Sequence, residues 1–187
     1  MACALVIVLM GIINLAPVVY SESVSTDTLG KKLTKLHFFF HDSLGGKSPS
    51  GVMVARANVT DTSGNAAPFG SVFAADDPLT EGPELTSPII GNARGLYLSA
   101  NQKNNETMLV MYYDFGFTTD EFNGSSISIL SRNPVGDTIR ELALVGGRGK
   151  FRMATGFAEL KTYSRSAVDL SATIEYNVTV YSMDPSD

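Results

Sequence analysis

The sequence predicts an all-β domain, because short apolar segments that alternate with polar residues are separated by turn residues. The alternation is clearest between residues 173 and 181, where every second residue is apolar: Ile174, Tyr176, Val178 and Val180. We find no convincing helical pattern. Such alternation is typical of the wall of a β-barrel or of a β-sandwich, and composition does not separate the two.

The strands that we expect follow one another without a linker or an internal repeat, so the chain of 187 residues is predicted to form one domain after a short processed segment. The expected strands cover residues 36–42, 52–55, 69–73, 95–100, 108–117, 125–130, 140–145, 151–160 and 173–181. Turn residues separate them at Asp76-Asp77-Pro78, at Phe122-Asn123-Gly124-Ser125, which resembles a hairpin, at Asn133-Pro134 and at Gly146–Gly149.

The N-terminus is predicted to be an export signal. Residues 2–20 are almost all apolar and carry no charge, and small residues follow at Ser21 and Ser23. We expect a signal peptide over residues 1–21 with cleavage after Ser21 or Ser23, a polar leader over 22–33 and the β-domain over 34–187. The alternative is an uncleaved anchor, since the run approaches a spanning length of about 18 residues.

Four N-glycosylation sequons support export to an extracellular space: they begin at Asn58, Asn105, Asn123 and Asn177. The alternative reading is chance occurrence in a chain rich in Ser and Thr. Cys3 is the only cysteine and lies in the expected signal. The mature protein is therefore predicted to have no disulfide and no thiolate chemistry.

Several other kinds of site are excluded. The net charge of −5 argues against nucleic acid and against an anionic membrane surface. His37 and His41 would lie about 13 Å apart on one strand at about 3.3 Å per residue, so we expect no metal site. Asp76 and Asp77 resemble a paired-carboxylate site, but a turn before Pro78 explains them.

We also expect no cofactor. The glycines of 146–149 lie between strands, where no helix N-terminus could receive a phosphate. Acid–base and binding chemistry from Asp, Glu, Arg and Tyr in an apolar cavity remains.

The most informative segment is the aromatic strand Leu36–Asp42, Leu-His-Phe-Phe-Phe-His-Asp, which ends on a carboxylate. It suits a pocket that holds a flat aromatic molecule and moves one proton. A carboxyl in apolar surroundings has a raised pKa, which favours proton exchange near neutral pH. The alternative is that Asp42 only caps the following turn.

Taken together, the motifs of this chain resemble those of the plant dirigent proteins. The resemblance runs from about Leu33 to Met183. The segments that carry it are Leu36–Asp42, Phe69–Val72, Asp76–Thr80, Gly95–Tyr97, Phe122–Ser125, Arg132–Val135, Arg140–Glu141, Val145–Phe151 and Glu175–Val178.

The resemblance implies an eight-stranded antiparallel β-barrel of the allene oxide cyclase type, assembled as a homotrimer. It implies a secreted glycoprotein of the apoplast. Dirigent proteins do not oxidise their substrates. A separate oxidase, a laccase or peroxidase, makes phenoxy radicals from phenylpropanoids such as coniferyl alcohol. The barrel then holds the radicals or their quinone methides so that one stereoisomer forms, as in lignan biosynthesis.

Residue by residue, the resemblance implies catalytic roles for Asp42, Arg140 and Tyr97. Arg140 could bind developing phenolate charge, and Tyr97 could donate to the same oxygen. Candidate substrate contacts are Phe38, Phe40, Asn133 and Phe151. The alternative readings are a surface ion pair for Arg140, an ordinary core tyrosine for Tyr97, and core packing for the phenylalanines.

Asn133 stands where pinoresinol-forming members carry an aspartate, which places the chain nearer to the pterocarpan synthases of the family. These dehydrate an isoflavanol through a quinone methide. Three hypotheses follow: a stereo-directing scaffold that is not itself an oxidase, a hydro-lyase of the pterocarpan synthase kind, and a non-catalytic defence protein that binds a small aromatic.

Overall fold

The computed structural model describes residues 22–24, 31–58, 67–102 and 107–183. The expected signal over residues 1–21 and the sequon at Asn105 lie outside this described part. Within the described residues, no helix has the length and apolar character needed to cross a membrane.

The described part contains ten strands and two short 3₁₀ turns, η1 (Asp120–Phe122) and η2 (Gly149–Phe151). The strands are β1 (Glu22–Val24), β2 (Lys31–Ser43), β3 (Gly51–Ala55), β4 (Val72–Thr80), β5 (Ile89–Ser99), β6 (Met108–Phe117), β7 (Ser126–Pro134), β8 (Arg140–Arg148), β9 (Thr155–Ser166) and β10 (Ser171–Met183).

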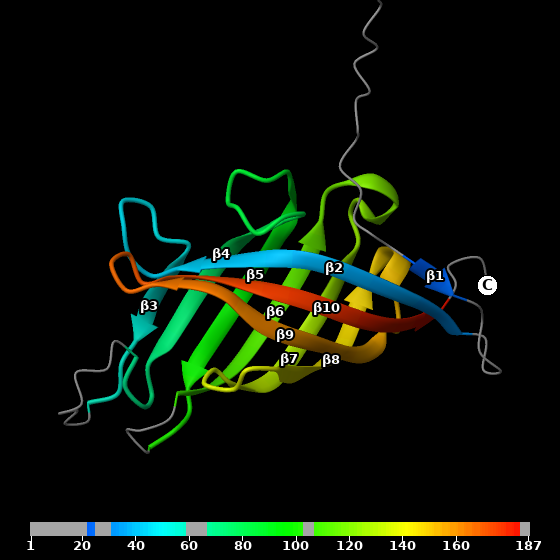
Figure 1. Cartoon of the computed structure of the whole chain (residues 1–187). Helices are drawn as coiled ribbons and strands as arrows, with labels where there is room; N and C mark the ends of the chain where they lie inside the picture. Colours follow the sequence, from blue (N-terminus) through cyan, green and yellow to red (C-terminus); the bar gives the residue numbers. More distant parts are fainter. Residues whose placement is uncertain (1–21, 25–30, 59–66, 103–106, 184–187) are drawn as a thin grey trace, which may run out of the picture.

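Eight of these strands close into an antiparallel barrel, which confirms the predicted fold. The sheet runs β2-β10-β9-β8-β7-β6-β5-β4, and β4 pairs back onto β2 to complete the ring. In Figure 1, β2, β10 and β9 cross in front of the strands β4 to β8. β1 and β3 are additional short strands beside β2 and β4 and lie at opposite ends of that view. β1 falls in the segment that we expected to be a polar leader.

The ring closes through a short seam between β2 and β4. Only Phe39–Thr80 and Phe40–Leu79 are paired across it, whereas β2 and β10 are paired over their whole lengths. Toward the N-terminal end of β4, the partner on this side changes from β2 to β3, and Ala75 pairs with Gly51. Across the seam, the imidazole Nε2 of His41 lies 2.6 Å from Oγ1 of Thr80.

The seam explains why one turn prediction was wrong. Asp76, Asp77 and Pro78 do not form a turn but lie inside β4 and pair with β5. Proline lacks the N–H that a central strand needs and is therefore confined to edges and irregular positions. Pro78 lies where β4 exchanges one neighbour for another, so its missing donor is tolerated there.

Two other turn predictions were also wrong in extent. Asn133-Pro134 forms the end of β7, and β8 continues to Arg148 through the glycines that we expected in a turn. The expected hairpin at 122–125 does connect β6 to β7, after η1. In β10, the apolar residues of the alternating face are buried and Asn177 is exposed, as the sequence pattern predicted.

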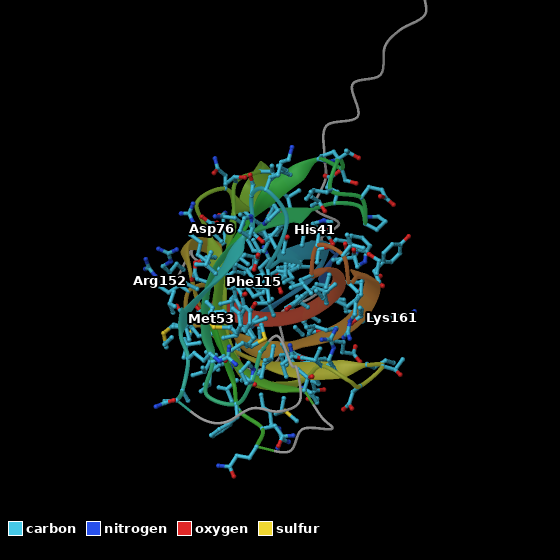
Figure 2. The ribbon with its side chains drawn as sticks, turned by 90° about the vertical axis from the view of Figure 1, so that its left-hand side faces the viewer. His41, Met53, Asp76, Phe115, Arg152 and Lys161 are labelled. Carbon is cyan, nitrogen blue, oxygen red and sulfur yellow. The ribbon has the colours of Figure 1, made fainter. Side chains whose placement is uncertain are left out.

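The barrel interior divides into two halves. One half is packed with aromatic rings: Phe117 lies 5.9 Å from Phe38 and from Phe151, and Phe122 stacks on Phe151 at 5.0 Å between ring centroids. Figure 2 shows Phe115 between the walls and Lys161 on the outside. The other half contains a cavity, and it is this half that holds the polar residues.

Candidate functional site

A cavity of about 90 Å³ occupies the polar half of the barrel. Its wall is mostly apolar and aromatic, which suits a flat phenolic guest. The residues that line it come from β2, β5, β6, β7, β8, β9, β10 and the start of the following loops: Phe40, Asp42, Tyr97, Leu109, Met111, Tyr113, Asn133, Val135, Arg140, Leu160, Thr162, Arg165, Ala172, Ile174 and Tyr176.

Asp42 lies near the end of β2, on the same face of the strand as Phe38 and Phe40. It lines the cavity, and its Oδ1 is buried with no hydrogen-bond partner among the described residues. Burial raises the pKa of Asp42 from 3.8 to about 6. A carboxyl in this state can hold or release a proton in the mildly acidic to neutral range.

Gly51 keeps the space beside this carboxyl open. A Cβ atom at position 51 would lie 3.2 Å from Oδ1 of Asp42 and 3.5 Å from the hydroxyl oxygen of Tyr97. The Tyr97 hydroxyl is also buried without a hydrogen-bond partner among the described residues, and its ring stacks on Phe73 at 4.8 Å. Two unsatisfied polar groups therefore border one small space, as expected of groups that await a ligand.

A second buried carboxyl belongs to the same half of the barrel. Asp77 on β4 is completely buried, and the hydroxyl of Tyr113 donates to its Oδ2 at 3.0 Å. Burial, together with the nearby Asp42 carboxyl, raises the pKa of Asp77 to about 7. Its neighbour Asp76 points outward and pairs with Arg94 on the exposed face of the sheet.

Arg140 supplies a buried positive charge to the cavity from β8, on a different wall from Asp42, whereas Arg165 of β9, which also lines the cavity, is exposed. It is 3% exposed, which excludes the surface ion pair considered from the sequence. Its guanidinium donates to Oδ1 of Asn133 at 3.3 Å and to Oγ1 of Thr162 at 2.9 Å, and its Nε has no partner among the described residues. Burial lowers the pKa of Arg140, but a guanidinium remains protonated in proteins.

The structure thus brings five of the seven predicted site residues together around one cavity: Asp42, Arg140, Tyr97, Phe40 and Asn133. Phe38 and Phe151 do not line it. Phe38 stacks on Tyr176 at 5.4 Å, and Phe151 packs against Phe122 in the aromatic half. Their placement supports the core-packing alternative rather than contact with a guest.

Sequence reasoning missed Asp77 and Tyr113. The signal for Tyr113 was present, because Met111, Tyr113, Phe115 and Phe117 alternate inward along a strand that was predicted with its correct bounds. The signal for Asp77 was hidden by Pro78, which favoured a turn. Had the strand been continued from Phe73, its period of two would have placed Asp77 inside.

The cavity borders two surface pockets. Val135 and Arg165 also line a pocket at the β7–β8 loop, and Asp42 and Ala172 also line a crevice beside the seam. The free volume of about 90 Å³ is smaller than the about 150 Å³ of an engineered cavity that binds benzene. Even a guest with one ring must therefore extend toward these openings or displace side chains.

Comparison with known proteins agrees with this geometry. The family model for dirigent-like proteins matches residues 33–181, which include every strand of the closed barrel except the first residues of β2 and the last of β10. The chain belongs to the dirigent family.

Relatives of this dirigent-family chain include both dirigents and pterocarpan synthases. Dirigent protein 15 of Arabidopsis thaliana is 48% identical, covering 81% of this chain and 80% of that protein. Pterocarpan synthase 1 of Glycyrrhiza echinata is 42% identical, covering 91% and 90%. The solved structure of the pterocarpan synthase dirigent protein GePTS1 superposes with a TM-score of 0.76 at 44% identity, covering 87% of this chain and 99% of that one.

Proposed function

We propose that this dirigent-family barrel binds a planar phenolic intermediate of the quinone methide class and directs its stereochemical outcome. The observation that carries the proposal is the pair of uncompensated groups in one apolar cavity: the Asp42 carboxyl on β2 and the Arg140 guanidinium on β8. Neither group has a partner of opposite charge within hydrogen-bonding distance among the described residues.

This arrangement complements the charge distribution of a quinone methide. Such a molecule has a carbonyl oxygen with phenolate character at one end and an electron-poor benzylic carbon at the other. A guanidinium presents a rigid fork of donors to the oxygen, and a carboxyl can accept or supply a proton near the benzylic end. Tyr97 offers a further donor beside Asp42. In an apolar cavity each of these interactions is stronger than in water.

In the first form of the proposal, a separate oxidase makes phenoxy radicals from a phenylpropanoid such as coniferyl alcohol. The barrel contributes no redox step. It holds the radicals or the resulting quinone methide in one orientation, so that coupling or ring closure gives one stereoisomer. This form has support from the 48% identity to a dirigent protein.

A second form makes the protein a hydro-lyase that generates its own quinone methide from an isoflavanol. The carboxyl of Asp42 protonates the departing hydroxyl, water leaves, and the conjugated phenol loses its proton to solvent, which gives the neutral quinone methide. On ring closure the proton of the attacking phenol returns to the Asp42 carboxylate, and the quinone methide oxygen regains a proton from solvent. The specific observation in its favour is the raised pKa of Asp42, about 6, because an acid of ordinary strength would already be ionised. The similarity to two pterocarpan synthases also supports it.

Incubation with coniferyl alcohol and a laccase, and separately with isoflavanols and no oxidase, tests both forms by chiral chromatography. Enantiomeric excess that depends on the laccase supports the scaffold. Conversion of an isoflavanol by the purified protein alone supports the hydro-lyase. If neither reaction shows stereoselectivity although the phenols bind, the non-catalytic aromatic-binding protein is the better reading and the proposal fails.

We further propose that the protein is secreted and glycosylated. Of the four sequons, three have their asparagine in the described part, and Asn58, Asn123 and Asn177 are all exposed. Exposure is required for a glycan on a folded protein. Digestion of the protein from plant extracellular fluid with a glycosidase would reduce its apparent mass, and an unchanged mass would contradict glycosylation.

Finally, we propose that copies of the barrel associate, in agreement with the trimer implied by the family. Directly paired residues on β3 to β7 form an apolar row on the outer surface: Val52, Ala74, Leu96, Tyr112 and Leu130. Leu96 and Leu130 are 47% and 51% exposed in the single chain. Contiguous apolar surface of this kind usually marks an interface.

The double substitution Leu96→Glu and Leu130→Glu should convert the oligomer into monomers in sedimentation at micromolar concentration, because each subunit would place charge in an apolar contact. Val168→Glu is the matched control, since Val168 is 98% exposed in the loop between β9 and β10. Wild-type protein that sediments as a monomer would contradict the proposal.

A further inference from the structure

Asp77 is a buried ionisable group that the proposed mechanism does not yet use. It lies on the inward face of β4 between Ala75 and Leu79, both of which are buried core residues. No cation pairs with it among the described residues. A completely buried carboxyl without a counter-charge costs several kcal/mol if it ionises, and apolar replacements would avoid this cost. Its presence therefore suggests a role beyond packing.

The hydroxyl of Tyr113 connects Asp77 to the cavity. Ser50, which also hydrogen-bonds to Asp77, lines the crevice beside the seam instead. Asp77 itself does not line the cavity, whereas Tyr113 does. The Tyr113 hydroxyl donates to Oδ2 of Asp77 at 3.0 Å, and its ring is fixed against Phe40 and Phe115 at 5.4 and 5.9 Å. The ring cannot easily turn away, so the hydroxyl oxygen stays between the carboxyl and the cavity.

A tyrosine hydroxyl has one proton to donate and lone pairs that accept. When Asp77 is ionised, the proton of Tyr113 is held by the carboxylate, and only the lone pairs of the oxygen are available to a guest. When Asp77 is protonated, the carboxyl can donate to the Tyr113 oxygen. The proton of Tyr113 is then free to turn toward the guest.

We propose that Asp77 is a positioning residue whose protonation decides whether Tyr113 offers the phenolic guest a hydrogen-bond acceptor or a donor. The inference rests on the proposed function of the cavity, because it assumes a phenolic guest. No bond is made or broken in the guest by this step: Asp77 keeps or releases one proton to solvent, and the Tyr113 O–H group only reorients.

The surrounding charges favour such a switch near neutral pH. Burial raises the pKa of Asp77 to about 7, and the Asp42 carboxyl on β2 adds to the shift. The pKa of Tyr113 is raised well above its ordinary value by burial and by Asp77, so that its hydroxyl stays neutral and acts as a relay rather than as a base. The other titratable groups around this part of β4 are His41 on β2, Tyr97 and Arg94 on β5, Tyr176 on β10, and Asp76 on the outer face of β4 itself; described β3 carries none.

Two probe ligands of nearly equal shape separate the two states of Tyr113. 4-Methylanisole can only accept a hydrogen bond, whereas 4-methylphenol can also donate one. Isothermal titration calorimetry between pH 5 and 9 should show 4-methylanisole binding about fivefold more weakly at high pH, the effect of losing one neutral hydrogen bond, with a much smaller change for 4-methylphenol.

Asp77→Asn should remove this pH dependence, because an amide does not titrate. Asp76→Asn is the matched control on the outer face and should leave the profile unchanged. Asp42→Asn should move the transition to lower pH, since the like charge that opposes ionisation of Asp77 is gone. If Asp77→Asn does not fold, Tyr113→Phe serves instead and should flatten the profile in the same way.

A profile for folded Asp77→Asn or Tyr113→Phe that matches the wild type would overturn the inference. The binding measurement needs no turnover, so its result is independent of the test of function. Stereoselective product without the ligand-dependent pH effect keeps the proposed function and rejects the switch. The pH effect without stereoselective product keeps the switch and rejects the function.

Discussion

The two halves of the barrel interior are built from the same strands but differ in what they contain: one is filled with aromatic rings, and the other holds ionisable groups around a cavity. In the aromatic half, Phe117, Phe122 and Phe151 fill the space with rings at 5.0 to 6.2 Å. In the other half, Asp77 and Arg140 are buried and Asp42 is partly buried, all without partners of opposite charge among the described ion pairs. Burial of rings stabilises the fold, whereas burial of lone charges destabilises it. The comparison indicates that the packing of rings in the aromatic half offsets the free-energy cost of the unpaired ionisable groups in the polar half.

The largest expected effect tests the aromatic half. Phe117→Ala removes a ring that is 2% exposed, and the unfolding free energy measured with denaturant should fall by about 3–5 kcal/mol, the usual cost of such a cavity. Val145→Ala, at a position that is 51% exposed, is the control and should change it by less than about 0.5 kcal/mol. Equal losses for both variants would mean that the ring packing is not the source of stability.

The next effect tests the polar half. Asp42→Asn should lower the rate or stereoselectivity of product formation by about 100-fold or more, within the range that general acid–base groups contribute. At neutral pH the unfolding free energy should be higher than in the wild type, because an amide is cheaper to bury than a carboxylate. Chiral chromatography and denaturant unfolding give the two readouts. Full activity in a folded Asp42→Asn variant would contradict the acid–base role of Asp42. Asp76→Asn, on the outer face, is the control and should behave as the wild type.

A further prediction concerns the pH dependence of stability, which tests both buried carboxyls together. The pKa values of Asp42 and Asp77 rise from 3.8 to about 6 and about 7, so between these limits the folded barrel holds more protons than the unfolded chain. The contribution of these groups to stability is complete below pH 3.8 and is lost as the pH rises toward about 7.

The double substitution Asp42→Asn and Asp77→Asn should remove that part of the dependence. Relative to the variant, the wild type should lose on the order of 3–4 kcal/mol of unfolding free energy per group between about pH 4 and 8. Unfolding curves at several pH values measure the difference. A constant difference between the two proteins across this range would show that neither carboxyl is perturbed.

The sequence predicted most of the strands because alternation of apolar and polar residues is a local property. It did not separate a barrel from a sandwich, and the closed eight-stranded barrel was predicted only through the resemblance to the dirigent family. It also predicted Asp42, Tyr97 and Arg140 as neighbours of one cavity, through the resemblance of their motifs to the dirigent family. Whether a given side chain is buried was harder to predict. Arg140 could also have been an exposed ion-pair partner, and the outcome depended on which face of β8 points into the barrel.

Asp77 was missed for a physical reason. Proline within an apparent strand normally ends it, and only the exchange of β2 for β3 along β4 makes Pro78 acceptable. That exchange is a property of the closed ring, which no local pattern contains. The separation of Phe38 and Phe151 from the cavity is equally non-local, because it depends on how far the rings of several strands fill one half of the barrel.

The pairing of β2 with β10 has a consequence for how the protein is made. Lys31–Ser43 pairs residue for residue with Ser171–Met183. During synthesis, β2 therefore has no main pairing partner until β10, more than a hundred residues later, has been made. Contacts between such distant segments slow folding. During synthesis, the nascent chain therefore exposes an aromatic edge from position 36 to 40 that other chains could join. Completion by the C-terminal segment is what removes that aggregation hazard.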